Sequence, residues 1–145
     1  MTLVAIERVR DAIKNDAALA AFWNSHYSKA AKVVIGYKRS ANAADFPAVN
    51  LVQVTGLRNA QTGNKEVISI VIGVNNPGIT NEVFDGITRV NEAGDLVLEA
   101  IKHCYVGDAR LVTDLGERHP FYELEISVQL RYRKEGKLFN SIGNT

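Results

Sequence analysis

The sequence predicts an α+β domain, in which a single, mostly antiparallel sheet of about five strands has two or three helices packed on one face. Helical periodicity is present in the opening segment and again near the middle of the chain. Short segments that are β-branched or alternate between apolar and polar residues are typical of strands. The links between strands favour antiparallel pairing in the order α, α, β, β, β, α, β, β.

The first two elements are predicted to be helices. Residues 3–14 place one apolar stripe among charged side chains, which is the pattern of an amphipathic helix. Asp16 precedes the run AALAAFW, where its carboxylate can accept backbone N–H bonds and cap a second short helix that runs to about His26. The stripe of the first helix consists of Leu3, Ile6, Val9 and Ile13.

Three strands are predicted next, over residues 32–38, 48–55 and 65–74. The connections between them, at 39–47 and 56–64, are long and polar, and we expect both to be loops. The third segment, KEVISIVIGV, is apolar on both faces, so we place it in the middle of the sheet.

The main helix follows a further long connection at 75–86, in which the run NNPG predicts a turn. We expect this helix to end near Tyr105, with Gly107 as its terminator. Gly94 lies within the apolar stripe and would let the helix approach a strand closely. The stripe consists of Ile87, Val90, Gly94, Val97, Ile101 and Cys104.

Two strands complete the predicted domain. The first is RLVTDL at 110–115, and the second alternates apolar and polar residues over 122–133, a length of roughly 40 Å at the usual rise per residue. We assign residues 1–133 to one α+β domain. Residues 134–145 hold few apolar side chains, and we expect them to form a flexible C-terminal tail.

The helices cover one face of this sheet and leave little to cover the other. The second face is polar along the last strand but carries Val67 and Val71 in the middle strand. Two interpretations stay open for it: a face covered by a partner or another subunit, or a partly solvated antiparallel sheet.

The composition of the chain excludes several classes of function. A chain of 145 residues with 46% hydrophobic and 23% charged residues has the make-up of one globular domain. Its formal charge of +1 gives no bulk attraction to nucleic acid or anionic lipid. The single Cys104 cannot form an intramolecular disulfide, and neither a signal peptide nor a membrane-spanning run is recognisable. We therefore expect a soluble protein without a membrane partner.

Motifs that carry chemistry are missing from the sequence. It contains no dinucleotide, P-loop, zinc-finger, zincin or hydrolase-elbow pattern, so we predict no cofactor, no metal and no catalytic residue. The strongest opposing hypothesis is a small hydrolytic enzyme that uses Glu117 and His119, in the turn GERHP, together with Glu123.

The order of elements, with the helix VNEAGDLVLEAIKHCY and the closing segments RLVTDLG and FYELEISVQLRYRK, resembles the tail terminator proteins of long-tailed bacteriophages. The resemblance implies a structural virion protein rather than an enzyme, a late gene product made in the host cytoplasm and incorporated into the tail. It implies a homo-oligomeric ring of six subunits that caps the tail tube, stops its polymerisation and provides the joining surface for the head connector.

The implied partners are further copies of the chain, the tail tube protein and the head–tail connector or neck proteins, with the tail sheath as an additional candidate. DNA would be only passing cargo. A head-completion or neck adaptor is the alternative within the same class.

Site residues follow as hypotheses from ring assembly, because a head-to-tail ring needs two different patches on each subunit. We expect Arg58, Asn59 and Gln61 to reach the tube or a neighbour. Phe139 and Ile142 are expected to dock onto another chain. Glu123 and Glu125 share one strand face and are predicted to line a lumen, where acidic walls let DNA pass without sticking.

Overall fold

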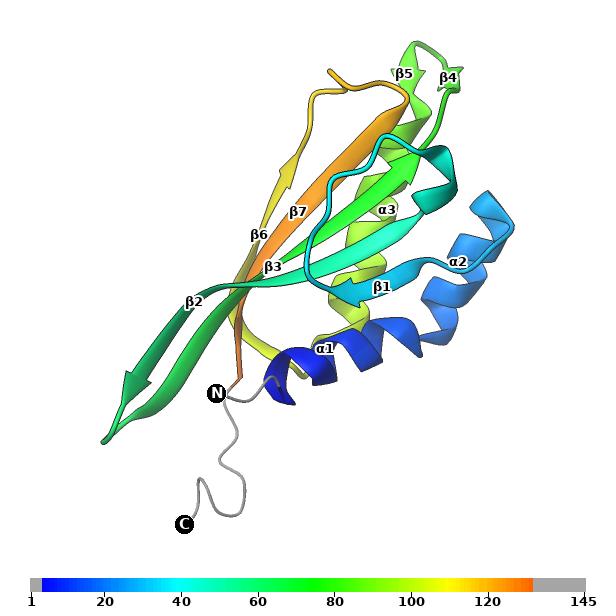
Figure 1. Cartoon of the computed structure of the whole chain (residues 1–145). Helices are drawn as coiled ribbons and strands as arrows, with labels where there is room; N and C mark the ends of the chain where they lie inside the picture. The colour runs from blue at the N-terminus through cyan, green and yellow to red at the C-terminus, as the bar shows by residue number, and fades with distance from the viewer. Residues whose placement is uncertain (1–3, 132–145) are drawn as a thin grey trace.

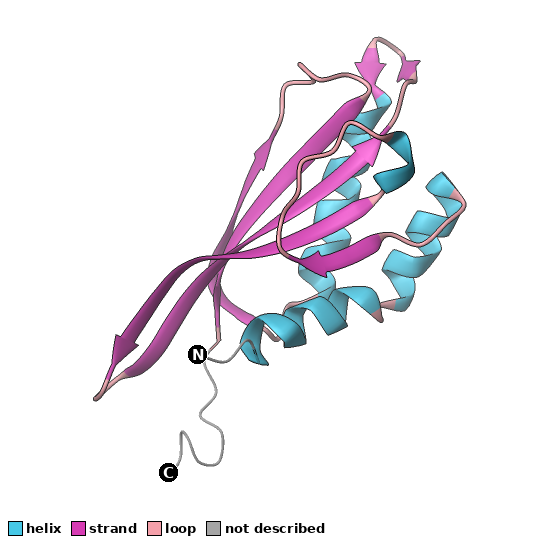
Figure 2. Cartoon of the chain, in the orientation of Figure 1, coloured by secondary structure: helices cyan, strands magenta, loops and turns pink. Residues whose placement is uncertain are grey.

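The structure, a computed structural model, describes residues 4–131 and confirms the α+β fold (Figure 1). Within these residues, the α-helices lie on one side of a five-stranded sheet with the strand order β1-β2-β3-β7-β6 (Figure 2). The helices are α1 (Val4–Lys14), α2 (Ala17–Tyr27) and α3 (Asp85–Ala100). The strands of the sheet are β1 (Lys32–Ile35), β2 (Ala48–Asn59), β3 (Gly63–Asn75), β6 (Tyr105–Thr113) and β7 (Phe121–Leu130).

Strand β3 lies in the middle of the sheet, as its two apolar faces predict. It pairs antiparallel with β2 on one side and β7 on the other, with Ile70 opposite Leu51 and Ile126. Because alternate residues of a strand point to opposite faces, this register brings one apolar row from each strand beneath the helices. The sheet's contribution to this core includes Val49, Leu51, Ile68, Ile70, Ile72, Val74, Tyr122, Leu124, Ile126 and Val128.

The amphipathic pattern of the first helix and the cap of the second are confirmed. Ile6, Val9 and Ile13 of α1 are buried in the core. The side chain of Asp16 caps α2 by accepting a hydrogen bond from the backbone N–H of Leu19 at 2.9 Å. This contact satisfies one of the N–H groups that every helix leaves unpaired at its start.

Strand β1 is shorter than predicted and runs parallel to β2, with Lys32 opposite Ala48 and Ile35 opposite Leu51. Parallel neighbours cannot be joined by a tight hairpin. The connection over residues 36–47 therefore travels back along the sheet and contains the 3-10 helix η1 (Ala43–Asp45).

The prediction of a long loop at 56–64 is wrong. Strands β2 and β3 continue as a paired ribbon to Asn59 and Gly63, so only residues 60–62 form the turn. Oδ1 of Asn59 accepts hydrogen bonds from the backbone N–H groups of Gln61 and Thr62, both at 2.8 Å, and Gly63 takes a φ of 91°. These local bonds close the hairpin, and they depend on the geometry of the turn rather than on an apolar pattern.

The connection at 75–86 also contains structure. A short hairpin forms between β4 (Ile79–Thr80) and β5 (Val83–Phe84), directly before α3. Its turn places Asn81 and Glu82 at positive φ, of 52° and 64°.

Helix α3 lies so close to β7 that two positions of the helix have room only for glycine. A Cβ added at Gly94 would lie 2.3 Å from Cδ2 of Leu124, which confirms the expected close approach. A second contact of this kind, at Gly86, was not predicted: a Cβ there would lie 1.9 Å from Cδ1 of Tyr122. Both positions require glycine because the strand side chains fill the space.

Three predicted boundaries need correction. Helix α3 ends at Ala100, five residues before the predicted end, because Tyr105 pairs with Leu130 at the start of β6. Gly107 does not end the helix. It lies within β6 at a φ of 74°, where the pairing with β7 is irregular. Strand β7 ends at Leu130, so the described part of the predicted 122–133 strand stops there; residues 132 and 133, like the predicted tail, lie outside the described residues.

Candidate interaction surface

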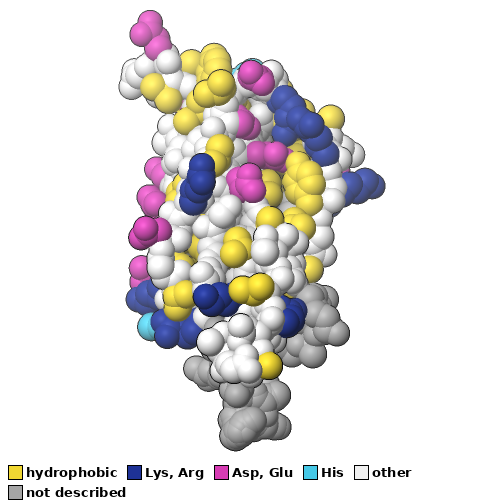
Figure 3. All heavy atoms as spheres, turned by 90° about the vertical axis from the view of Figure 1, so that its left-hand side faces the viewer, with side chains coloured by type: hydrophobic (Ala, Val, Ile, Leu, Met, Phe, Trp, Pro, Cys, Tyr) yellow, Lys and Arg dark blue, Asp and Glu magenta, His cyan; other side chains and the backbone are white. Residues whose placement is uncertain are grey.

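The face of the sheet opposite the helices is hollowed into a groove of about 520 Å³. We call it the open-face groove. In Figure 3, which looks toward this side of the molecule, hydrophobic and acidic side chains lie next to one another on the exposed surface. The groove is lined by Tyr37, Val52, Val54, Ser69, Val71, Val112, Asp114, Glu123 and Glu125.

The floor and sides of the groove are apolar. Val54 is 60% exposed and Val112 is 55% exposed, although both lie in strands of the main sheet. Val54 falls where the pairing of β2 with β3 skips a residue between Gln53 and Thr55, so it belongs to a β-bulge. Bulges re-aim side chains, and here one adds an apolar group to the groove.

Three carboxylates stand beside this apolar floor. Glu123 accepts a hydrogen bond from the Tyr37 hydroxyl at 2.7 Å and forms an ion pair with Arg118 at 3.5 Å. Glu125 accepts a hydrogen bond from the Ser69 hydroxyl at 2.5 Å. Asp114 accepts bonds from backbone N–H groups, including that of Glu123 at 2.6 Å. Most of these donors are neutral, so the groove keeps an acidic character.

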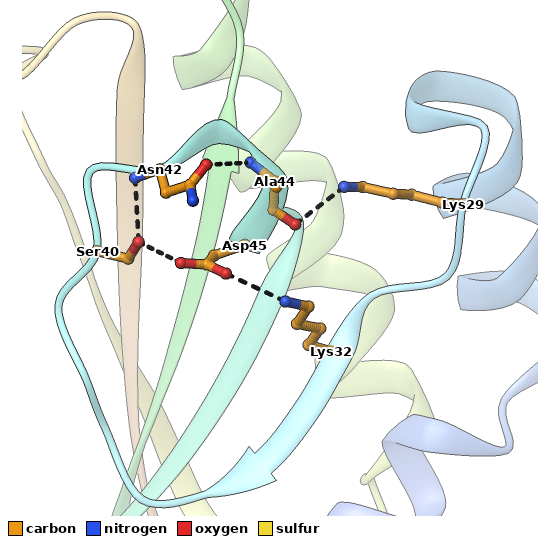
Figure 4. A network of polar contacts seen from close by, with 6 residues as sticks. All are labelled: Lys29, Lys32, Ser40, Asn42, Ala44 and Asp45. Atoms are coloured by element: carbon orange, nitrogen blue, oxygen red, sulfur yellow. Dashed lines mark hydrogen bonds and ion pairs between the residues drawn. The ribbon is translucent and has the colours of Figure 1, made fainter.

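Tyr37 forms one wall of the groove from the connection after β1. Its position is supported by a polar network that ties this connection together (Figure 4). Asp45 accepts hydrogen bonds from the Ser40 hydroxyl at 2.5 Å and from Nζ of Lys32 at 3.1 Å. The hydrogen bond from Ser40 and the adjacent Lys32 ammonium hold the pKa of the Asp45 carboxyl below its ordinary value.

Burial, followed by the hydrogen bond to Glu123, raises the pKa of the Tyr37 phenol to about 12. The phenol therefore stays protonated over the physiological range and acts as the donor to the Glu123 carboxylate.

Aromatic rings close one end of the open face. Phe46 is 8% exposed and lies over Gly73, where an added Cβ would be 2.8 Å from Cε1 of the phenylalanine. Its ring also packs against Phe121, with centroids 5.3 Å apart. The uncovered part of the face is consequently the region around the open-face groove.

The second feature is the end of the β2–β3 hairpin, which projects beyond the sheet at the lower left of Figure 1. We call residues 54–66 the arm. β1 pairs with β2 only as far as Leu51, and β7 pairs with β3 only from Val67, so both edges of the arm lack a neighbouring strand in the described chain. Every residue from Val54 to Thr62 is exposed.

The arm carries three of the residues that the sequence singles out. Arg58 forms an ion pair with Glu66 across the hairpin at 3.4 Å, and Asn59 holds the turn in which Gln61 lies. Arg58 and Asn59 are strand residues rather than loop residues, but all three are exposed at the end of the arm. Phe139 and Ile142, the other predicted contacts, lie outside the described residues.

Residues of the alternative enzyme hypothesis are not gathered into one site. The His119 ring packs against Phe84, with centroids 5.0 Å apart, and hydrogen-bonds through Nδ1 to the hydroxyl of buried Tyr122. Glu123 follows Tyr122 in β7 and points to the open face. Glu117 is exposed in the preceding turn.

Residues 4–131 contain no group of three or more His, Cys, Asp or Glu residues placed to hold a metal ion. Among their helices, none combines the length and the hydrophobicity that crossing a bilayer requires.

Comparison with known proteins adds no relative: no protein-family model matches the chain, and neither does any curated protein.

Sequence reasoning found part of this surface. Val67 and Val71 were predicted to lie on this second face, which the last strand lines with polar side chains. Val71, Glu123 and Glu125 do line the groove, whereas Val67 is not among its lining residues. Tyr37 and Val112 were missed. The alternation of residues along its strand could have placed Val112 on the open face. Tyr37 follows the end of β1 and reaches the groove only because of the path that the connection takes.

Proposed function

We propose that this protein is a structural subunit that assembles with copies of itself into a ring, and that the ring is a phage tail terminator. In this role it caps the tail tube, stops tube polymerisation and presents its other side to the head connector. The proposal combines the resemblance in the order and character of the sequence segments with two features of the described residues.

The arm is the observation that carries the proposal. A two-stranded ribbon is only marginally stable in water, and unpaired strand edges are templates for pairing with another chain. Leu57 is 54% exposed on the arm, and burial of its apolar side chain against a partner would be favourable. An element of this kind is expected to be ordered by contact with a neighbour or with the tube.

The open-face groove supplies the second feature. Head-to-tail rings need two different patches on each subunit, because each interface joins one surface to another. The arm and the open-face groove differ in shape and chemistry and share only Val54, where the arm begins. Together they satisfy this requirement.

Light scattering coupled to size exclusion tests self-association. The chain is expected to elute as an oligomer with a mass close to six times the 15.9 kDa of one copy. Leu57→Asp places a charge on the arm and is expected to release smaller species. Thr88→Asp is the matched control, because Thr88 is exposed on α3, on the side of the sheet away from the open-face groove. A wild-type chain that stays monomeric at all concentrations would refute the proposal.

Electron microscopy tests the terminator role itself. Phage particles made without this chain are expected to carry overlong tails, because nothing stops addition of tube subunits. Tails of normal length that fail to join heads would instead indicate the neck adaptor.

A further inference from the structure

We infer that the open-face groove binds residues 132–145 of a neighbouring copy, so that each subunit is clasped by the chain of the next. This inference rests on the proposed self-association and names the segment that secures it. It is carried by the chemistry of the groove, the composition of the segment and the point at which β7 ends.

The groove requires an occupant that is both apolar and cationic. Its exposed valines, Val54 and Val112, favour burial of apolar side chains. Glu123 and Glu125 stand beside them, and the latter is bonded to a neutral hydroxyl rather than to a cation. Nucleic acid would be repelled by these carboxylates. A purely apolar partner would desolvate Glu125 with only the neutral Ser69 hydroxyl to compensate its charge.

Residues 132–145 have the complementary composition. The sequence YRKEGKLFNSIGNT places three cations and one acid ahead of three apolar side chains. Phe139 and Ile142 can fill the apolar floor while the cations meet the carboxylates. The cations are Arg133, Lys134 and Lys137, and the apolar residues are Leu138, Phe139 and Ile142.

The direction of β7 favours a neighbouring copy over a return to the same groove. Glu123 lies near the start of β7, and the chain leaves the strand at Leu130, seven positions and roughly 23 Å further on. The backbone N–H of Arg131 still donates to the carbonyl of Cys104 at 2.8 Å, so the described residues end pointing away from their own groove, and a return to it would require a reversal of direction. Fourteen extended residues span up to about 50 Å, enough to reach an adjacent subunit.

This assignment gives Glu123 and Glu125 a different role from the predicted lumen. Carboxylates that bind a neighbour's cations are covered and do not face passing DNA. The lumen would then be lined by other parts of the subunit.

Cross-linking in the full chain tests the contact directly. Copies carrying Val112→Cys are mixed with differently tagged copies carrying Phe139→Cys and treated with a short bismaleimide. The expected product joins the two tags. The control pairs Phe139→Cys with Asp95→Cys, an exposed position on α3 at the opposite side of the sheet. Wild-type protein reports any background from Cys104.

Each outcome decides the inference. A mixed-tag product well above the control supports it. Equal yields in both pairs would remove residues 132–145 from the groove. In a chain that carries Val112→Cys and Phe139→Cys together, a product linked only within one chain would show that the segment returns to its own groove, against the inference.

A second experiment measures the contribution of the segment to assembly. Phe139→Asp is expected to raise the concentration for half-assembly by about 10- to 100-fold, the equivalent of leaving one phenylalanine unburied. Asn140→Asp adds the same charge beside it and is expected to change this concentration less than about threefold. Glu125→Gln is expected to weaken assembly by about two- to fivefold and to reduce its salt dependence.

These results separate the two proposals. A wild-type chain that never assembles refutes the ring. If the ring forms equally well with Phe139→Asp but is disrupted by Leu57→Asp, the proposed function stands. Only the binding of residues 132–145 in the neighbouring groove is then refuted.

Discussion

Replacing Gly86 by alanine is expected to destabilise the protein, although alanine is the better helix former. Gly86 lies in the first turn of α3, where alanine would gain up to about 1 kcal/mol of helix propensity. Its Cβ would lie 1.9 Å from Cδ1 of Tyr122, whereas ordinary contacts begin near 3.4 Å. The shortfall is therefore roughly 1.5 Å.

The tyrosine ring has no free space into which it can move. Tyr122 is fully buried, packs against Phe84 with centroids 6.1 Å apart and is hydrogen-bonded to His119. Helix α3 must move outward instead and loosen its contacts with the sheet. Overpacking of this kind costs about 1–3 kcal/mol, and the overlap with a fully buried ring places this site at the upper end of that range. A cost of about 3 kcal/mol less a gain of about 1 kcal/mol in propensity leaves an expected net loss of about 2 kcal/mol.

Urea and thermal unfolding, followed by circular dichroism, measure this loss. For a domain of this size, about 2 kcal/mol corresponds to a fall in Tm of roughly 4–8 °C. Thr88→Ala, at an exposed position of the same helix, is the control and is expected to change stability by less than about 0.5 kcal/mol. If Gly86→Ala is as stable as wild type, α3 does not press on β7 as described, and the reasoning fails.

Three further predictions concern single side chains. Asp16→Ala removes the cap of α2 and should lower the free energy of unfolding by about 1 kcal/mol, whereas the exposed neighbour Asn15→Ala should not, in urea titrations. The phenol of Tyr37 should ionise near pH 12 in an absorbance titration, and Glu123→Gln should lower this pKa. Because the folded state raises the pKa above the ordinary value of about 10, the stabilisation from this phenol is complete below pH 10 and is lost as the pH rises through 12. Burial raises the pKa of the Cys104 thiol, so alkylation at pH 8 should be slower in the folded than in the urea-unfolded chain; equal rates would contradict that burial.

Local patterns predicted most elements of this fold. The apolar stripes of α1 and α3, the cap at Asp16 and the doubly apolar strand β3 each depend on residues close together in the chain. Gly94 could be identified as a close-approach position because it replaces a large residue within a stripe. These features are encoded within one or two helical turns or a single strand.

The boundaries that failed depend on pairing between distant segments. The ribbon at 56–64 is polar, so nothing in its pattern separates a paired hairpin from a loop. Helix α3 stops at Ala100 because Tyr105 pairs with Leu130 across the sheet, which no helical pattern records. The same limit applied to the candidate surface, where Tyr37 was missed and Arg58 was assigned to a loop.

The sequence alone determined which residues of each helix and strand are apolar, and hence that one face of the sheet would be covered and the other left open. Only the tertiary structure decided that β1 lies parallel to β2, that the following connection brings Tyr37 to Glu123, and that the β2–β3 hairpin projects as an arm. The physical reason is the distance along the chain over which each kind of interaction acts. Side-chain periodicity is a property of a short segment, whereas strand direction, register and the path of a connection are set by the packing of residues far apart in the chain.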